Sequence, residues 1–256
     1  MHPMAPLLII RAGSAFPAMI ARMGDFSDWI AAGLGAPSVP VQVVDPRHEA
    51  LPADASGVVI TGSHAMVTDR EAWSEAVARW LPGLIGREVP VLGICYGHQL
   101  LAHALGGAVA FHPEGIEIGT VRVRRTGACA GDPVLGHLPD SFPAQAIHRQ
   151  TVATLPPGAE VLAANDVEPH HAVRYGRLVW GVQFHPEFSA EAMRGTIDHL
   201  AAELERDGLD PAALDAAVGP TPEAARVLQA FGALVEECCL RMRAGRQRPA
   251  TQVAPA

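Results

Sequence analysis

The N-terminal half of the chain contains short apolar runs of strand length, and this feature most limits the folds that it can adopt. Most of the runs lack the polar alternation of a strand with one face in water, so they are predicted to be buried on both faces. Amphipathic helical stretches separate them, as in successive β-α units. The sequence therefore predicts a mostly parallel sheet with helices on both faces, its first strands being Leu7–Ile10, Val41–Val44, 57–61 and 89–94.

Three helical patterns alternate with these runs. They cover residues 18–32, residues 71–85 and the segment from Cys95 to Gly106-Gly107. Each has apolar side chains at helical spacing, and the last ends at a glycine pair that suits a helix C-terminus. We expect these helices to cover the faces of the sheet.

The pattern changes after residue 108. Predicted strands then follow one another closely, separated by turn residues, which indicates a small antiparallel excursion that returns to a last central strand at 179–184. Beyond Pro186 the chain is predicted to be helical, with proline in the first turn of two helices. The expected antiparallel strands are 121–123, 144–147, 160–164 and 171–175, and the expected helices are 190–206, 211–218 and 222–242.

These patterns describe one domain over residues 1–243, of flavodoxin-like, doubly wound α/β class. Residues 244–256 are rich in Pro, Gln and Arg and lack an apolar face, so a disordered tail is expected. No linker divides the body into independent domains.

Charge and cysteine content narrow the functional classes. Nineteen Lys and Arg against 27 Asp and Glu give a net charge of −8, which argues against binding to nucleic acid or to an anionic membrane. No apolar run approaches the ~20 residues of a membrane span. The N-terminus lacks the features of a signal peptide, and the four cysteines have neither a paired framework nor metal-site spacing. We therefore predict a cytoplasmic protein with reduced cysteines, and no metal or cofactor is expected.

The heptapeptide Gly93-Ile94-Cys95-Tyr96-Gly97-His98-Gln99 lies between a predicted buried strand and a helix. A cysteine at such a turn is the thiol counterpart of the nucleophile elbow of serine hydrolases. Gly93 and Gly97 lack a Cβ atom, which lets the backbone tighten and a substrate approach. The helix N-terminus favours an anion, so we expect the pKa of the Cys95 thiol to lie below the ordinary value of about 8.5.

A second motif, Val182-Gln183-Phe184-His185-Pro186-Glu187, follows the last predicted central strand. Pro186 holds His185 in an extended conformation, in which side chains two positions apart point the same way. Glu187 is therefore predicted to contact the His185 ring, fix its tautomer and stabilise its imidazolium form. Together with Cys95 these residues would form a nucleophile, a base and an orienting acid.

With both motifs in view, the chain resembles the class I (triad) glutamine amidotransferases, and most closely the GMP-synthase-like glutaminase domains that occur as free-standing proteins. The resemblance covers residues 7–243. It includes Thr61-Gly62-Ser63 after the third strand and the segment around His148. At the turn after the third strand, relatives often have Gly-Gly-Pro, whereas this chain has Gly62-Ser63-His64. After the histidine, relatives often have Gly-Asp, whereas this chain has Arg149-Gln150.

The resemblance implies the role of each residue. Cys95 would attack the glutamine side-chain amide and form a γ-glutamyl thioester, with His185 as acid and base and Glu187 orienting it. The Tyr96 N–H and one from Gly62-Ser63 would form the oxyanion hole. Further contacts to substrate would come from four residues: Gln99, His148, Gly93 and Gly97.

Three functions remain open on sequence grounds. The first is a glutamine amidotransferase that supplies ammonia to an acceptor on a separate synthetase chain, since no acceptor-activating motif such as a P-loop is present. The second is a γ-glutamyl peptidase or hydrolase that uses the same triad on larger γ-glutamyl amides. The third is a non-catalytic binding module on the same scaffold. The sequence names neither the acceptor, the partner nor the oligomeric state.

Overall fold

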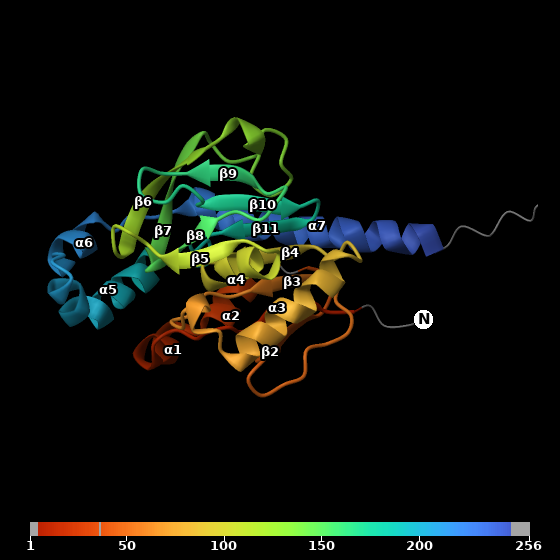
Figure 1. Ribbon diagram of the computed structural model, residues 1–256, viewed down its shortest axis with the longest axis horizontal. Coiled ribbons are helices and arrows are strands. Elements are labelled where there is room, and N and C mark those ends of the chain that lie inside the picture. Colours follow the sequence, from red (N-terminus) through yellow and green to blue (C-terminus); the bar gives the residue numbers. More distant parts are fainter. Residues whose placement is uncertain (1–4, 36, 247–256) are drawn as a thin grey trace, which may run out of the picture.

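A computed structural model of the chain describes residues 5–35 and 37–246. Within them, a nine-stranded sheet has the order β2-β1-β3-β4-β11-β10-β9-β6-β7 (Figure 1). Its first five strands are parallel to one another. These strands are β1 (Leu7–Ile10), β2 (Val41–Val44), β3 (Gly57–Ile60), β4 (Val91–Ile94) and β11 (Val179–Val182). The order 2-1-3-4 followed by a last parallel strand is that of flavodoxin-like sheets, so the predicted fold class is confirmed.

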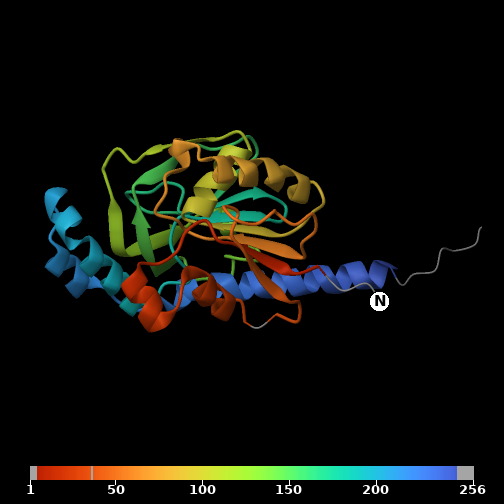
Figure 2. The same ribbon diagram turned by 90° about the horizontal axis from the view of Figure 1, so that it is seen from below.

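The central strands form because nearly every residue in them is apolar and buried on one face or the other. Leu7 and Ile9 of β1 point to one face, and Leu8 and Ile10 to the other. The first face packs on helices α2 (Phe26–Gly33) and α7 (Pro222–Arg246), and the second on α3 (Ala72–Ile85) and α4 (Tyr96–Ala104). Figure 2 shows α7 beneath the sheet and α3 above it.

The other four strands extend the sheet in antiparallel fashion beyond β11. They are β10 (Ala172–Gly176), β9 (Glu160–Ala164), β6 (Glu117–Arg125) and β7 (Ser141–His148). A separate two-stranded sheet joins β5 (Ala108–Phe111) and β8 (Gln150–Thr154), neither of which was predicted. Strand β8 is short and mostly polar, whereas β5 is the short apolar run Ala-Val-Ala-Phe, whose residues are largely exposed.

The helix expected over residues 18–32 is two helices, and that prediction was wrong. Helix α1 (Pro17–Met23) ends at Gly24, whose φ of +83° suits glycine and stops the helix. Helix α2 begins again at Asp25, which forms a reciprocal capping box with Asp28. Phe16 at the N-cap of α1 and Met19, its buried residue, line one cavity with Cys95.

The C-terminal segments follow the sequence closely. Helix α5 (Ala190–Arg206) is capped by Ser189, and α6 (Pro211–Ala217) by Asp210. Helix α7 runs through Arg246, so the first three residues of the predicted tail are helical, and residues 247–256 lie outside the described part of the chain. Among the described helices, none is both long and apolar enough to cross a membrane.

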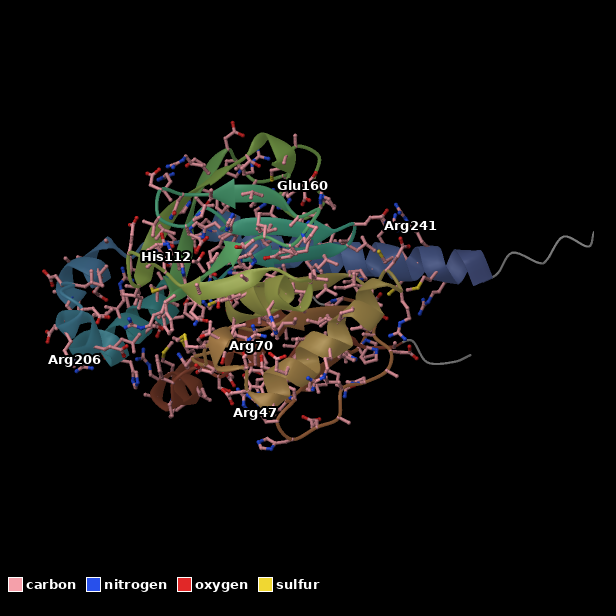
Figure 3. All side chains as sticks on the ribbon, viewed as in Figure 1. Arg47, Arg70, His112, Glu160, Arg206 and Arg241 are labelled. Carbon is pink, nitrogen blue, oxygen red and sulfur yellow. The ribbon has the colours of Figure 1, made fainter. Side chains whose placement is uncertain are left out.

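Loops at the carboxyl ends of the parallel strands are tied together by side chains. Arg47, labelled in Figure 3, lies 4.0 Å above the Trp73 ring and donates a 2.6 Å hydrogen bond to the Ala12 carbonyl. Asp45 accepts a hydrogen bond from Arg11. These contacts join the loops after β1 and β2 to helix α3. Both predicted motifs open onto this same end of the sheet.

Candidate active site

Cys95 occupies a strained turn between β4 and α4. Its φ of 49° and ψ of −101° are unusual for a residue with a side chain, and it stands at the N-cap of the helix. Its N–H donates to the Val182 carbonyl at 2.8 Å, and its carbonyl accepts from the Gln99 N–H. The turn is thereby fixed between two strands and a helix, and the Cys95 side chain lies at the positive end of α4.

Gly93 and Gly97 allow this turn because they meet other backbone atoms directly. A Cβ on Gly93 would lie 2.4 Å from the Gly97 carbonyl, and one on Gly97 would lie 2.5 Å from the Ile60 carbonyl oxygen. Helix α4 therefore packs against β3 and β4 at a distance that only glycine permits. The structure gives both residues a packing role, and their contact with substrate stays a prediction.

Replacing Gly97 by alanine is expected to lower the free energy of unfolding by at least about 3 kcal/mol, since the added methyl group would collide with backbone that cannot move aside. Urea unfolding of the variant measures this. Gly83→Ala is the matched control, because that glycine lies in helix α3 with no neighbour within 4 Å. The control should be unchanged or more stable by up to about 1 kcal/mol. Equal stability of the two variants would contradict the packing argument.

His185 and Glu187 form a buried pair just beyond β11. His185 Nδ1 lies 2.8 Å from a Glu187 carboxylate oxygen, and their side chains are 3% and 0% exposed. The His185 N–H donates to the Gln145 carbonyl at 2.7 Å, which holds the backbone against β7. The predicted contact between these two side chains is therefore present.

The charges around His185 favour its protonated form. Burial alone lowers the pKa of His185, but the negative charges of Glu187 and Cys95 outweigh it and raise that pKa to about 10. Nε2 of the ring has no hydrogen-bond partner among the described residues. With Nδ1 turned to Glu187, Nε2 is the nitrogen left for proton transfer.

The turn after β3 lies against His185 and Cys95. A Cβ on Gly62 would lie 2.8 Å from Cε1 of His185 and 3.7 Å from Cβ of Cys95. Ser63 follows, and its hydroxyl accepts from the Ala65 N–H. The Tyr96 N–H stands in the first turn of α4, where helix geometry supplies no carbonyl partner. Two segments predicted for an oxyanion hole thus flank Cys95.

A cavity of about 40 Å³ opens onto Cys95 and His185. Its polar walls include Ser63 and His64. Burial lowers the pKa of His64, and the positive charge of His185 lowers it further, so His64 is neutral at pH 7. The apolar lining is Ala15, Phe16, Met19, Phe26, Ile147 and Phe188. The cavity brings together the nucleophile, the base and the turn after β3.

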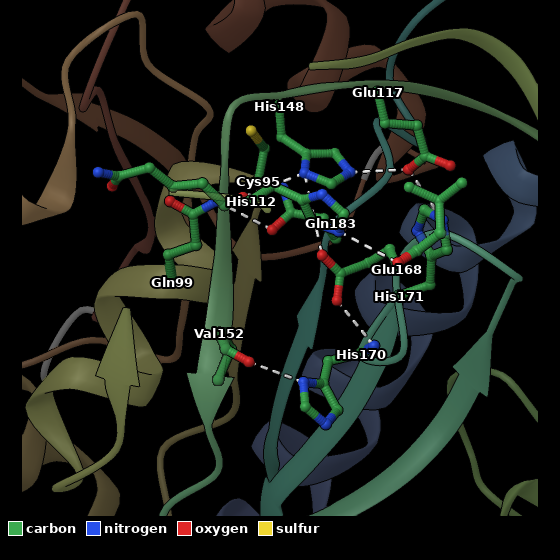
Figure 4. A network of polar contacts seen from close by, with 12 residues as sticks. Cys95, Gln99, His112, Glu117, His148, Val152, Glu168, His170, His171 and Gln183 are labelled. Carbon is green, nitrogen blue, oxygen red and sulfur yellow. Dashed lines mark hydrogen bonds and ion pairs between the residues drawn. The ribbon is translucent and has the colours of Figure 1, made fainter. Parts of the chain in front are cut away.

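Gln99 and His148 do not line this cavity. The Gln99 side-chain amide donates to the Gln150 carbonyl at 2.8 Å and to Oε1 of Gln183 at 2.9 Å. His148 contacts Glu117 through Nε2 at 2.7 Å and the Gln150 carbonyl through Nδ1 at 3.0 Å. Figure 4 shows both side chains in a buried polar network beside Cys95. Their predicted contact with substrate remains a prediction.

Glu117 and Glu168 belong to this network and were missed by sequence reasoning. Glu117 is paired with His148 across β6 and β7, a register that the sequence does not reveal. Glu168 is fully buried, and one of its oxygens lies 3.9 Å from Nδ1 of His148. The two ring nitrogens of His148 face a Glu117 carboxylate oxygen and the Gln150 carbonyl. The network thus joins His148 directly to Glu117, with Glu168 close by.

Glu117→Gln tests this buried pair. Burial by itself raises the pKa of Glu117, but the hydrogen bond from His148 and the His171 ring, 3.3 Å away, outweigh it and hold that pKa well below its ordinary value. The ionised carboxylate therefore stabilises the fold above about pH 4.3, and that contribution is lost as the pH falls further. We expect the variant to lose about 3 kcal/mol at pH 7, with a smaller loss at pH 3.5, in urea unfolding.

Glu160→Gln is the control for this measurement. Glu160, labelled in Figure 3, pairs with Arg174 at the surface. Loss of this ion pair should lower the free energy of unfolding by at most about 1 kcal/mol. A Glu117→Gln variant as stable as this control at pH 7 would show that the buried charges contribute nothing.

Comparison with known proteins gives the family. The sequence model described as Glutamine amidotransferase class-I matches residues 20–199, more than half of the chain. The chain belongs to the class I glutamine amidotransferase family. The matched segment of this family member contains Cys95, His185 and Glu187.

Individual relatives agree with this assignment. The chain is 36% identical over 164 residues to the glutamine amidotransferase-like protein YfeJ of Salmonella typhimurium, covering 61% of this chain and 68% of that protein. It is 39% identical over 131 residues to a GMP synthase [glutamine-hydrolyzing] of Thermomicrobium roseum, covering 51% of this chain. The match spans only 23% of that synthase.

Solved structures show the same fold. A glutamine amidotransferase from Methylobacillus flagellatus superposes with a TM-score of 0.65 at 26% identity, covering 99% of this amidotransferase chain and all of the other. One from Thermotoga maritima has a TM-score of 0.64 at 24% identity, covering 94% and 99%.

Proposed function

We propose that the chain hydrolyses the side-chain amide of glutamine through a γ-glutamyl thioester on Cys95 and releases ammonia. The observation that carries this proposal is that His185, held by the buried Glu187, lines the same cavity as Cys95. A cysteine in a strained strand-to-helix turn, with a protonated histidine beside it, has the surroundings of a thiolate nucleophile.

In the first half of the reaction the Cys95 sulfur attacks the amide carbon. The oxygen becomes negatively charged and accepts hydrogen bonds from the Tyr96 N–H and from the Gly62-Ser63 turn. The C–N bond then breaks, and His185 delivers the proton from Nε2 to the departing nitrogen. Ammonia leaves, and the glutamyl group stays on sulfur as a thioester.

In the second half His185, now neutral, accepts a proton from a water molecule that attacks the thioester carbon. The C–S bond breaks, glutamate leaves, and the sulfur returns as the thiolate beside protonated His185. Glu187 keeps Nε2 directed at the reacting atoms in both halves and stabilises the imidazolium form.

The released ammonia would aminate an acceptor held by a synthetase. GMP synthases carry a glutamine-hydrolysing activity in their names, and this chain resembles part of one. We propose a synthetase on a separate chain as the partner.

The test is the release of glutamate and ammonia from glutamine by the purified full chain. We expect the two products in a 1:1 ratio, and at least a hundredfold slower release from asparagine, whose amide lies one methylene nearer the α-carbon. Release of neither product from glutamine or from any γ-glutamyl amide would overturn the proposal and favour a non-catalytic binding module.

A γ-glutamyl hydrolase is the second candidate, since larger amides would pass through the same thioester. The apolar lining beside His185 favours it, because ammonia has no apolar surface to bury there. Comparing glutamine with substituted γ-glutamyl amides separates the two functions.

A further inference from the structure

The rings around His185 form a continuous aromatic wall, which we define as Phe26 and Phe188. The Phe188 ring centroid lies 4.3 Å from that of His185, and the Phe26 centroid lies 6.4 Å from it. The two phenylalanines pack on each other at 5.6 Å, and Trp29 meets the edge of both. Phe26 and Phe188 are only 4% and 5% exposed, so the aromatic wall is a packed surface.

The wall stands where the leaving group must be. A proton passes from Nε2 of His185 to the departing nitrogen only within hydrogen-bond reach, roughly 3 Å. Any substituent on that nitrogen therefore lies within a few ångströms of the rings that contact His185. The glutamyl chain extends from the other side of the carbonyl carbon.

Apart from the reacting pair, Cys95 and His185, the lining carries no charge. None of the other described residues that line the cavity is Asp, Glu, Lys or Arg, and His64 is neutral at pH 7. A carboxylate on the leaving amine would be desolvated there beside a His185 ring that is no longer a cation once its proton has passed to the leaving nitrogen. An alkyl or aryl group would bury apolar surface against the wall.

Phe16 lines the cavity from the N-cap of helix α1. Its ring is stacked on His64 at 4.4 Å and on His199 at 3.7 Å, and it is only partly buried. Short helix α1, which follows it, has Met19 as its one buried residue. The closed cavity of about 40 Å³ is smaller than the ~150 Å³ that holds a benzene ring. A substituted amide therefore needs part of the lining to move, and Phe16 and its stacked partner His64 are the least buried rings of that lining.

We propose that the preferred substrates are γ-glutamyl amides of apolar amines, with the amine substituent on the aromatic wall and Phe16 as its gate. This rests on the proposed thioester chemistry and changes only the leaving group. Sulfur displaces R–NH⁻ from the γ-carbonyl, His185 supplies the proton that makes it R–NH₂, and water then releases glutamate from the thioester.

The experiment compares kcat/KM of the full chain for glutamine and for the N-methyl, N-butyl and N-benzyl γ-glutamyl amides. Methylamine and butylamine are of similar basicity, so the difference between their two amides reports on contacts with the wall. We expect a rise of about fourfold for each methylene that the wall covers. The N-(2-carboxyethyl) amide matches the butyl amide in length but ends in a carboxylate, and should fall below the methyl amide.

Phe16→Ala tests the gate in the same assay. Removing the ring should raise the ratio of kcat/KM for the benzyl amide to that for glutamine by about tenfold or more. An unchanged ratio would remove Phe16 from the proposal.

The outcomes distinguish a failure of the apolar-amine preference from a failure of the proposed thioester hydrolysis. If glutamine or the carboxyethyl amide is hydrolysed better than the butyl and benzyl amides, the apolar-amine preference is wrong while thioester hydrolysis stands. If no γ-glutamyl compound is hydrolysed, the proposed function fails and this inference with it.

Discussion

Cys95→Ala is expected to lower kcat for glutamine by at least about 10⁵-fold, because no thioester can form without the sulfur. Loss of the nucleophile in a hydrolytic triad has an effect of this order. Ammonia release under saturating glutamine measures it. The variant should fold normally, since alanine removes only one atom from a small cavity.

Cys238→Ala is the control for this variant. Cys238 lies on helix α7, and burial raises the pKa of its thiol. Its replacement should leave kcat within about twofold of the parent. A Cys95→Ala protein that keeps the parental rate would exclude a thioester at this position.

Glu187→Gln is expected to lower kcat by about 10²- to 10⁴-fold, because the amide can favour the wrong tautomer of His185 and no longer stabilises its imidazolium form. Glu187 also contributes to the raised pKa of His185, so that pKa should fall in the variant. The alkaline limb of the kcat/KM profile reports loss of the proton that His185 gives to the leaving nitrogen. It should therefore move from near pH 10 to lower pH.

Glu191→Gln controls for the loss of a carboxylate nearby. Glu191 pairs with Arg22 at the surface, and both side chains are more than 60% exposed. Neither kcat nor the pH profile should change. A parental profile in Glu187→Gln would show that the buried carboxylate does not govern the proton on His185.

Local sequence signals were enough to predict the parallel sheet and the contact between His185 and Glu187. A continuous run of apolar residues predicts a strand that is buried on both faces, and all four residues of Leu7–Ile10 are 0% exposed. The side-chain alternation around Pro186 places Glu187 on His185 without tertiary information, and the 2.8 Å contact follows. Cys95 was recognisable because glycines flank it between a strand and a helix.

Features that depend on long-range register could not be predicted in this way. Glu117 meets His148 only because β6 and β7 pair in one register, and the two residues are 31 positions apart. The aromatic wall joins Phe26 from α2 to Phe188 after β11, and neither carries a local sign of its neighbour. The break between α1 and α2 could have been predicted, because Gly24 favours the end of one helix and Asp25 the N-cap of the next.

The most direct test of the triad is the intact mass of the full chain after reaction with an electrophilic glutamine analogue that alkylates thiolates. We expect one adduct, located on Cys95 by peptide mapping, that glutamine prevents competitively and that Glu187→Gln slows. Cys129, Cys238 and Cys239 serve as internal controls and should stay unmodified. An unlabelled Cys95 in the folded protein, or equal labelling of the other three cysteines, would contradict the central claim that this sulfur is the activated nucleophile.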